Sequence, residues 1–390
     1  MKWKFYSLAF VAGMSILTAC SSDDNNDNDG NGGNGNGNEI ENGTILKGTI
    51  TSDVTLAAGN TYKLSGEYIV EEGGTLHIEE GVKIIAVYDD IADYILVKQG
   101  GKINAVGTPD KPIVMTSEKE EPGAWGGIHI CGRAHTNAEG GKGSSEIGGA
   151  VYGGNDDADN SGTLQYIRLE YTGFAFDEEH EANGISFYGV GNGTIVDHCQ
   201  AYKGSDDGFE FFGGSVNVSN LVAVSCSDDS FDWTEGWNGK GTNLVAYQEA
   251  ESTLGYDCDC LMECDNNGSN NAATPVAHPV LKNLILVGNG GSKQGIRLRA
   301  GTEVEIDNAK VCGKGQPLTV ETALTENALK NGTSKLTNIT LTSELSCKEG
   351  IYTHADFIAV TSNKVDANLS YSSFEDIRKE CSWMNGSWVK

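Results

Sequence analysis

The stretch QAYKGSDDGFEFFGG at residues 200–214 returns 22 residues later as VAVSCSDDSFDWTEG at residues 222–236. A shorter repeat follows, in which Asn220-Leu-Val-Ala recurs as Asn243-Leu-Val-Ala. A repeat this short cannot bury an apolar face by itself, so its copies must stack on one another. The alternation of apolar and polar residues inside each copy favours strands. The sequence therefore predicts an all-β solenoid, a parallel β-helix with one repeat in each coil.

The first residues have the pattern of a lipoprotein export signal. Two lysines precede an apolar run that is too short to span a bilayer, and Leu17-Thr18-Ala19-Cys20 has the form of a lipobox. We expect residues 1–19 to be removed and Cys20 to carry palmitate and other acyl chains that anchor the protein in a membrane. An ordinary secretory signal with a chance cysteine is the alternative.

The rest of the chain divides into three predicted parts. Residues 20–43 contain almost nothing that can be buried, so we expect a flexible tether behind Cys20. The strand pattern then predicts a β-helix over residues 44–345 and a C-terminal cap over residues 346–390. In the cap, the pattern predicts a short helix within residues 372–381, with Trp383 and Trp388 covering the open end of the solenoid.

Composition limits the classes of partner. The net charge of −28 argues against nucleic acid and anionic lipid surfaces, and it permits divalent cations. Nine cysteines follow Cys20 in a compartment that allows disulfides, and an odd number leaves at least one thiol unpaired within the chain. The pairs Cys199 with Cys226 and Cys347 with Cys381 are candidate bridges, although spacing alone does not fix them.

Two sets of residues resemble known proteins. Asp23 and Asp24, just behind Cys20, resemble the start of surface lipoproteins of Bacteroidota, in which an acidic pair marks export to the outer leaflet. The segments Trp125-Gly-Gly-Ile, Gly189-Val-Gly-Asn-Gly-Thr and Ser205-Asp-Asp-Gly-Phe-Glu resemble right-handed β-helix lipoproteins of the same bacteria. The resemblance implies a right-handed parallel β-helix, anchored in the outer membrane and facing the cell exterior. It implies no particular reaction.

Stacking predicts a charged column on one outer face. Equivalent residues of successive coils lie about 4.8 Å apart, and alternation sends Phe209, Phe211, Phe231 and Trp233 inward. The same alternation sends their polar neighbours outward. Read along the stack, we expect this face to carry Glu210, Asp232, Asp259 and Arg297.

Carboxylates stacked this closely repel one another unless a cation, a proton or water separates them. The bend before each strand adds Asp206 and Asp207 in one coil and Asp228 and Asp229 in the next. With Glu210 and Asp232, these side chains form a candidate Ca²⁺ site, because Ca²⁺ takes six to eight oxygen ligands. The alternative is a solvated acidic face whose aspartates only shape the turns.

A second candidate Ca²⁺ site lies in the segment from Asp157 to Gly162. Asp157 and Asp159 match the first half of a D-x-D-x-[DNS]-G loop. The twelfth position is Arg168 and not glutamate, which excludes an EF-hand. A shorter calcium loop and a plain Asp-rich turn remain the two interpretations.

An enzymatic interpretation rests on the same face. The paired aspartates, followed downstream by Gly295-Ile-Arg-Leu-Arg, are similar to elements of β-helix enzymes that degrade pectin. In that case Asp207 and Asp229 would be the acid and the base or nucleophile of a hydrolase, or Arg297 the base of a Ca²⁺-dependent lyase. The Gly-His-Gly of the pectin hydrolases is missing from the chain.

The sequence favours a binding or adhesion scaffold whose acidic surface is supported by Ca²⁺ and engages a polysaccharide or host glycan. This inference comes from the architecture. The alternatives are a polysaccharide lyase or glycoside hydrolase on the acidic face, and a structural spacer.

Overall fold

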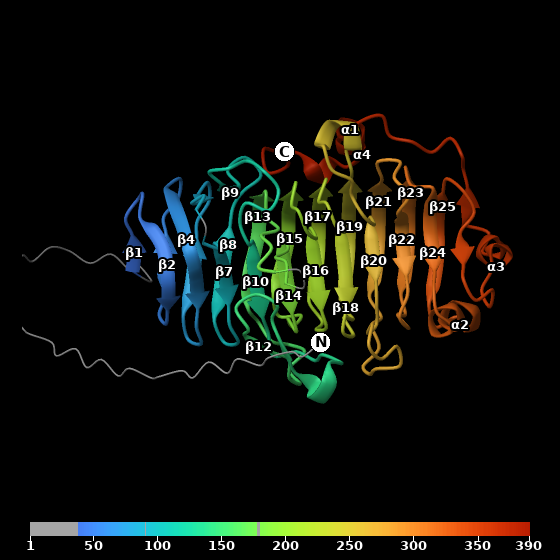
Figure 1. The fold of residues 1–390 in the computed structure, drawn as a ribbon, viewed down its shortest axis with the longest axis horizontal. Coiled ribbons are helices and arrows are strands. Elements are labelled where there is room, and N and C mark those ends of the chain that lie inside the picture. Colours follow the sequence, from blue (N-terminus) through green and yellow to red (C-terminus); the bar gives the residue numbers. More distant parts are fainter. Residues whose placement is uncertain (1–37, 90, 178–179) are drawn as a thin grey trace, which may run out of the picture. The chain divides into compact units, whose positions relative to one another are not determined.

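A computed structural model describes residues 38–89, 91–177 and 180–390. These residues form a stack of coils whose strands pair in parallel with strands of neighbouring coils (Figure 1). The predicted parallel β-helix is thereby confirmed. The predicted signal peptide and Cys20 lie outside the described residues. Among the described residues, no helix is both long enough and apolar enough to cross a membrane.

One long ladder of strands carries the 22-residue repeat. Phe209 of β16 pairs with Phe231 of β18, and Glu210 pairs with Asp232. Residues that are 22 positions apart in the sequence therefore lie directly opposite each other in neighbouring strands. The strands of this ladder are β4 (Thr61–Val70), β7 (Tyr94–Val97), β10 (Ile128–Cys131), β14 (Ile185–Tyr188), β16 (Phe209–Phe212), β18 (Phe231–Thr234), β20 (Met262–Cys264), β22 (Gln294–Leu298), β24 (Gln316–Val320) and β26 (Ser346–Cys347).

A second long ladder bends at asparagine residues. Asn220, Asn243, Asn283 and Asn308 have left-handed φ angles between 56° and 64°. Their amides form a row in which each Nδ2 donates to the Oδ1 of the previous coil, at 2.8, 3.0 and 2.9 Å. The row satisfies these amides and holds the bend at one place in successive coils. The strands are β8 (Lys102–Val106), β9 (Ile113–Ser117), β13 (Gly162–Glu170), β15 (Ile195–Tyr202), β17 (Asn217–Val224), β19 (Lys240–Tyr247), β21 (Val280–Val287), β23 (Glu305–Cys312), β25 (Lys335–Leu341) and β27 (Lys364–Val365).

Apolar and aromatic side chains fill the interior of the coils. Phe209 stacks on Phe231 with ring centroids 5.6 Å apart, and Phe211 stacks on Trp237 at 4.2 Å. All four rings are at least 98% buried, as is Trp233, which confirms the predicted inward direction of the repeat aromatics. Offset and stacked rings of this kind add to the stability gained from burial.

The segment between β10 and β13 packs along the outside of the coils. It contains η1 (Glu139–Gly141) and the antiparallel pair β11 (Gly143–Ser144) and β12 (Val151–Tyr152). Ile147 and Tyr152 join a second apolar cluster with Tyr188 and Leu96. The segment also runs close to Gly213, where a Cβ atom would lie 2.8 Å from His135 O.

The two ends of the solenoid differ from the predicted boundaries. β1 (Asn38–Ile40) pairs with β3, so strand structure begins inside the predicted tether. At the other end the strands continue to β27, inside the predicted cap. The first coils also contain β2 (Ile45–Ile50), β3 (Val54–Leu56), β5 (Thr75–Ile78) and β6 (Lys83–Ala86), and the helices are α1 (Glu251–Leu254), α2 (Ala323–Asn331), α3 (His354–Ala359), α4 (Phe374–Glu380) and η2 (Ser382–Met384).

The predicted helix near the C-terminus is present as α4, but it does not close the end of the stack. The chain turns back, and α4 lies beside the middle coils while α2 and α3 lie at the end (Figure 1). Trp388 is fully buried, 5.2 Å from the His198 ring and 6.1 Å from the Tyr166 ring. The prediction that Trp388 covers the open end was therefore wrong, because the apolar outer face of the second ladder accepts it instead.

The nine described cysteines are free thiols, and all except Cys347 are buried. The candidate bridges Cys199 with Cys226 and Cys347 with Cys381 are therefore not formed in this structure. Inside the coils the thiols behave as small apolar side chains.

Candidate metal centre

The predicted column of charged side chains is present, but one of its four residues differs from the prediction. Glu210 pairs with Asp232, Asp232 pairs with Glu263, and Glu263 pairs with Arg297. Asp259 was placed in this column by the sequence, and that placement was wrong. The strand of its coil begins only at Met262, so Asp259 lies in the bend before it and Glu263 occupies the column.

The aspartates of the bends have a structural role in addition to their charge. Asp229 N donates to Asp207 Oδ1 at 2.8 Å, and Cys260 N donates to Asp229 Oδ1 at 2.6 Å. One coil earlier, Asp207 N donates to Asn183 Oδ1 at 3.2 Å. Asp207 and Asp229 are both buried. Through its Oδ1, each of these two carboxylates therefore ties its bend to the next one along the stack.

The acidic side chains come close enough to share a cation. In four groups of three, ligand atoms lie within 4.8 Å of one another. Asp207 and Asp232 each belong to two of these groups, and so does Asp229, so the groups form one continuous cluster. We call this cluster the acidic face. Its groups are Asp206 with Asp207 and Asp228, Asp207 with Glu210 and Asp232, Asp229 with Asp232 and Glu263, and Asp229 with Asp259 and Cys260.

Crowding and burial make the acidic face hold protons. Burial, followed by repulsion from neighbouring carboxylates, raises the pKa of Asp207, Glu210, Asp229 and Asp232 well above the usual range. The pKa of Asp206 rises to about 7 for the same two reasons. Without a cation, part of the face is therefore protonated at neutral pH. A divalent cation would displace those protons.

Asp232 lies at the centre of the acidic face and has an unused ligand atom. Its Oδ1 is buried and has no hydrogen-bond partner among the described residues. Its neighbour Glu210 is oriented differently, because Glu210 Oε2 accepts a 2.5 Å hydrogen bond from Asn183 Nδ2. A buried carboxylate oxygen without a donor is costly unless it binds a proton or a cation.

The arginines at the end of the column are already paired. Arg297 Nη1 lies 3.0 Å from Glu263 Oε2, and Arg297 Nε lies 3.2 Å from Glu321 Oε1. Arg299 contacts Glu263 and also Asp265, the latter at 2.7 Å. These contacts raise the pKa of Arg297 against the effect of burial. Arg297 is therefore held as a charged ion-pair partner, which opposes its predicted use as a base.

Two acidic residues that the sequence did not single out also contribute. Glu146, on the segment between β10 and β13, accepts a 3.3 Å hydrogen bond from Tyr188 OH, and burial raises its pKa to about 7. Its charge raises the pKa of Glu210. The charge of Glu181 likewise raises the pKa of Asp206 and the pKa of Asp228. Neither position belongs to the 22-residue repeat, so no pattern in the sequence placed them on this face.

The second candidate Ca²⁺ site has a different arrangement. Asp157 Oδ1 lies 2.6 Å from His135 Nδ1, and Asp159 Oδ2 accepts from Arg133 N at 3.1 Å. Among the described residues, neither aspartate belongs to a group of ligand atoms that lies within reach of one ion. The geometry instead favours the alternative interpretation, an Asp-rich turn that braces the segment from Arg133 to His135.

Comparison with known proteins supports the fold. The chain matches the family model described as a pectate-lyase-like beta helix domain over residues 48–389, which is most of its length. No curated protein and no solved structure matched the chain significantly.

Proposed function

Since the chain belongs to the family of pectate-lyase-like beta-helix domains, we propose that it is a binding scaffold whose acidic face takes up Ca²⁺ and supports the engagement of glycans. The lipobox adds the place of action: Cys20 carries the lipid, and the solenoid is displayed at the outer membrane toward the exterior. The rigid stack of coils is suited to presenting fixed groups over a long surface.

The observation that carries the cation proposal is the position of Asp232. Asp232 belongs to two groups of three carboxylates, one with Glu210 and one with Glu263, and its buried Oδ1 has no hydrogen-bond partner among the described residues. Oxygen ligands of this kind suit Ca²⁺, which accepts flexible geometry and completes its coordination with water. We expect a Kd on the order of 10⁻⁴–10⁻³ M, as in other extracellular modules.

Calorimetric titration of the full chain with CaCl₂ tests the proposal. We expect saturable binding that releases protons, seen as an enthalpy that changes with the ionisation enthalpy of the buffer. Asp232→Asn is expected to weaken binding about tenfold or more. Glu251→Gln, which removes an exposed carboxylate on α1, is the matched control and is expected to bind normally. Binding that is unchanged in Asp232→Asn contradicts the assignment.

Cleavage of a polysaccharide is the second candidate function, and the description of the family favours it. The residues assigned to it are Asp207, Asp229 and Arg297. Against it stand the ion pairs of Arg297 and the backbone hydrogen bonds that both aspartates accept. Incubation with a polysaccharide panel separates the two functions, because a scaffold releases no new reducing ends and no unsaturated products.

A further inference from the structure

Two segments that leave the first ladder meet beside the end of β18. Asn137, on the segment after β10, donates from Nδ2 to Asn266 Oδ1 at 2.8 Å and to Pro275 O at 3.0 Å. Asn267 Nδ2 donates back to Asn137 Oδ1 at 3.0 Å. Between these segments lies a pocket of about 670 Å³. Because Asn137 is buried and fully hydrogen-bonded, the pocket walls are held in place before any ligand binds.

Glu235, in the wall of this pocket, occupies a position that earlier coils give to glycine. Residues that follow the paired strands β14, β16 and β18 are Gly189, Gly213 and Glu235, with φ angles of 55°, 63° and 53°. A left-handed conformation costs a non-glycine residue roughly 1–2 kcal/mol. Glu235 Oε2 accepts from Thr136 Oγ1 at 2.7 Å and from Tyr152 OH at 2.8 Å. These bonds hold the strained residue in place, so the wall of the pocket at Glu235 is fixed.

The pocket is lined by residues with polar side chains. They include the acidic residues Glu139 and Glu235, the hydroxyl residues Thr234 and Ser269, and Asn270, and no lysine or arginine is among the described residues of the lining. Asn270 Oδ1 accepts from Ala272 N, which leaves its Nδ2 as a donor. Carboxylate and hydroxyl oxygens accept hydrogen bonds from ligand hydroxyls, and the amide and hydroxyls donate to them. An anionic ligand would lie beside two acidic residues and, within the described lining, beside no lysine or arginine.

We propose that this pocket binds the end of a neutral oligosaccharide through its hydroxyl groups. The volume lies in the range of about 300–1,000 Å³ that is typical of small-ligand sites. The inference rests on the proposed glycan-binding function and assigns it a place and a class of sugar. One wall of the pocket, formed by Thr234 and Glu235, follows Asp232 in the same coil. Glu235 lies three residues beyond Asp232, which is at most roughly 10 Å at the rise of a strand.

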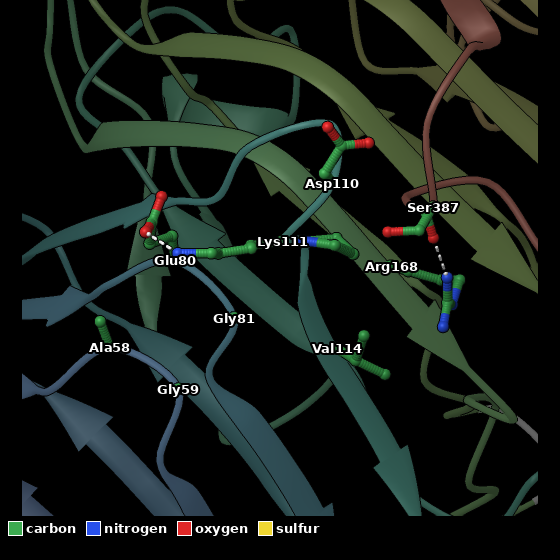
Figure 2. Close-up of a pocket in the computed structure, with 10 residues that line it drawn as sticks. Ala58, Gly59, Glu80, Gly81, Asp110, Lys111, Val114, Arg168 and Ser387 are labelled. Carbon is green, nitrogen blue, oxygen red and sulfur yellow. Dashed lines mark hydrogen bonds and ion pairs between the residues drawn. The ribbon is translucent and has the colours of Figure 1, made fainter.

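A second pocket provides an internal control. It has a volume of about 540 Å³, and its lining includes Glu80, Asp110, Lys111, Arg168 and Ser387 (Figure 2). Its cations are paired with neighbours in the same pocket: Lys111 Nζ with Glu80 Oε1 at 2.8 Å, and Arg168 Nη1 with Ser387 O at 2.7 Å (Figure 2). We expect this pocket to contribute nothing to the binding of neutral sugars.

Saturation-transfer NMR of the full chain with a panel of neutral di- to tetrasaccharides, and with uronate-containing ones for comparison, tests the proposal. Ser269→Trp fills the pocket from an exposed position, and Glu139→Gln removes an exposed carboxylate, so neither change removes a buried contact. We expect transfer to at least one neutral sugar, its loss in Ser269→Trp, an affinity about tenfold weaker in Glu139→Gln, and no change in Asp110→Asn.

Three results overturn the inference, and they are distinguishable. Full binding of a neutral sugar by both Ser269→Trp and Glu139→Gln leaves glycan binding in place but moves it elsewhere on the chain. Exclusive binding of uronate-containing sugars refutes the neutral class. The absence of transfer from any sugar to the unaltered chain, with Ca²⁺ present, refutes the proposed glycan-binding function together with its site.

Discussion

The acidic face makes the stability of the cation-free protein depend on pH. Burial, with repulsion from Asp228, raises the pKa of Asp206 from 3.8 to about 7. A carboxyl with a higher pKa in the folded than in the unfolded chain binds more protons when folded, so folding becomes less favourable as pH rises through that interval. For Asp206 the interval from pH 3.8 to about 7 corresponds to about 4 kcal/mol. This is an upper value, because solvent screens the partly exposed group.

Urea unfolding between pH 4 and pH 8, in EDTA and in excess CaCl₂, measures this effect. In EDTA we expect the free energy of unfolding to fall as pH rises from 4 to 7. In CaCl₂ we expect the fall to be smaller, because a cation that binds only the folded chain stabilises it most where the carboxylates are ionised. Asp206→Asn is expected to flatten the EDTA profile. A stability in EDTA that stays constant or rises over this interval refutes the reasoning, and so does a profile that CaCl₂ leaves unchanged.

Three further predictions concern the fold. Trp388→Ala is expected to lower the free energy of unfolding by about 3–5 kcal/mol, as for other buried tryptophans, and to leave the Ca²⁺ affinity unchanged. Loss of Ca²⁺ binding in a folded Trp388→Ala protein would contradict the separation between the acidic face and the apolar outer face of the second ladder. Gly213→Ala is expected to cost about 1–3 kcal/mol in urea unfolding, because its Cβ would lie 2.8 Å from His135 O, whereas Gly315→Ala, with open space around it, is expected to cost less. Asn243→Leu removes two side-chain hydrogen bonds and is expected to cost about 2 kcal/mol; an unchanged melting temperature shows that the asparagine row adds no stability.

The sequence predicted the parts of the fold that follow from the repeat. The offset between Glu210 and Asp232 is correct because both coils have bends of the same length, so equal spacing in sequence becomes equal height in the stack. The next coil breaks this rule. Its longer approach to β20 moved Glu263 into the column in place of Asp259, and spacing alone does not reveal how an insertion is divided between bend and strand.

Other residues influence the acidic face through tertiary contacts that the 22-residue repeat does not predict. Glu146 reaches it from a segment that packs back over the coils, and the apolar residues holding that segment, such as Ile147, are too sparse to form a pattern. The packing of Trp388 on the middle coils likewise depends on tertiary contacts that no pattern in the sequence predicts. A buried tryptophan near a C-terminus indicates that it packs against something, but the partner is set by the tertiary structure.

The central claim is that carboxylates of successive coils share a cation at Asp232. Diffraction from crystals soaked in CaCl₂, recorded at a wavelength where calcium scatters anomalously, tests it most directly. We predict an anomalous peak within coordination distance of Asp232 and at least one of Glu210, Asp207, Asp229 and Glu263. Calcium peaks found only elsewhere on the molecule, with Asp232 Oδ1 bonded to water or a proton alone, would contradict the claim.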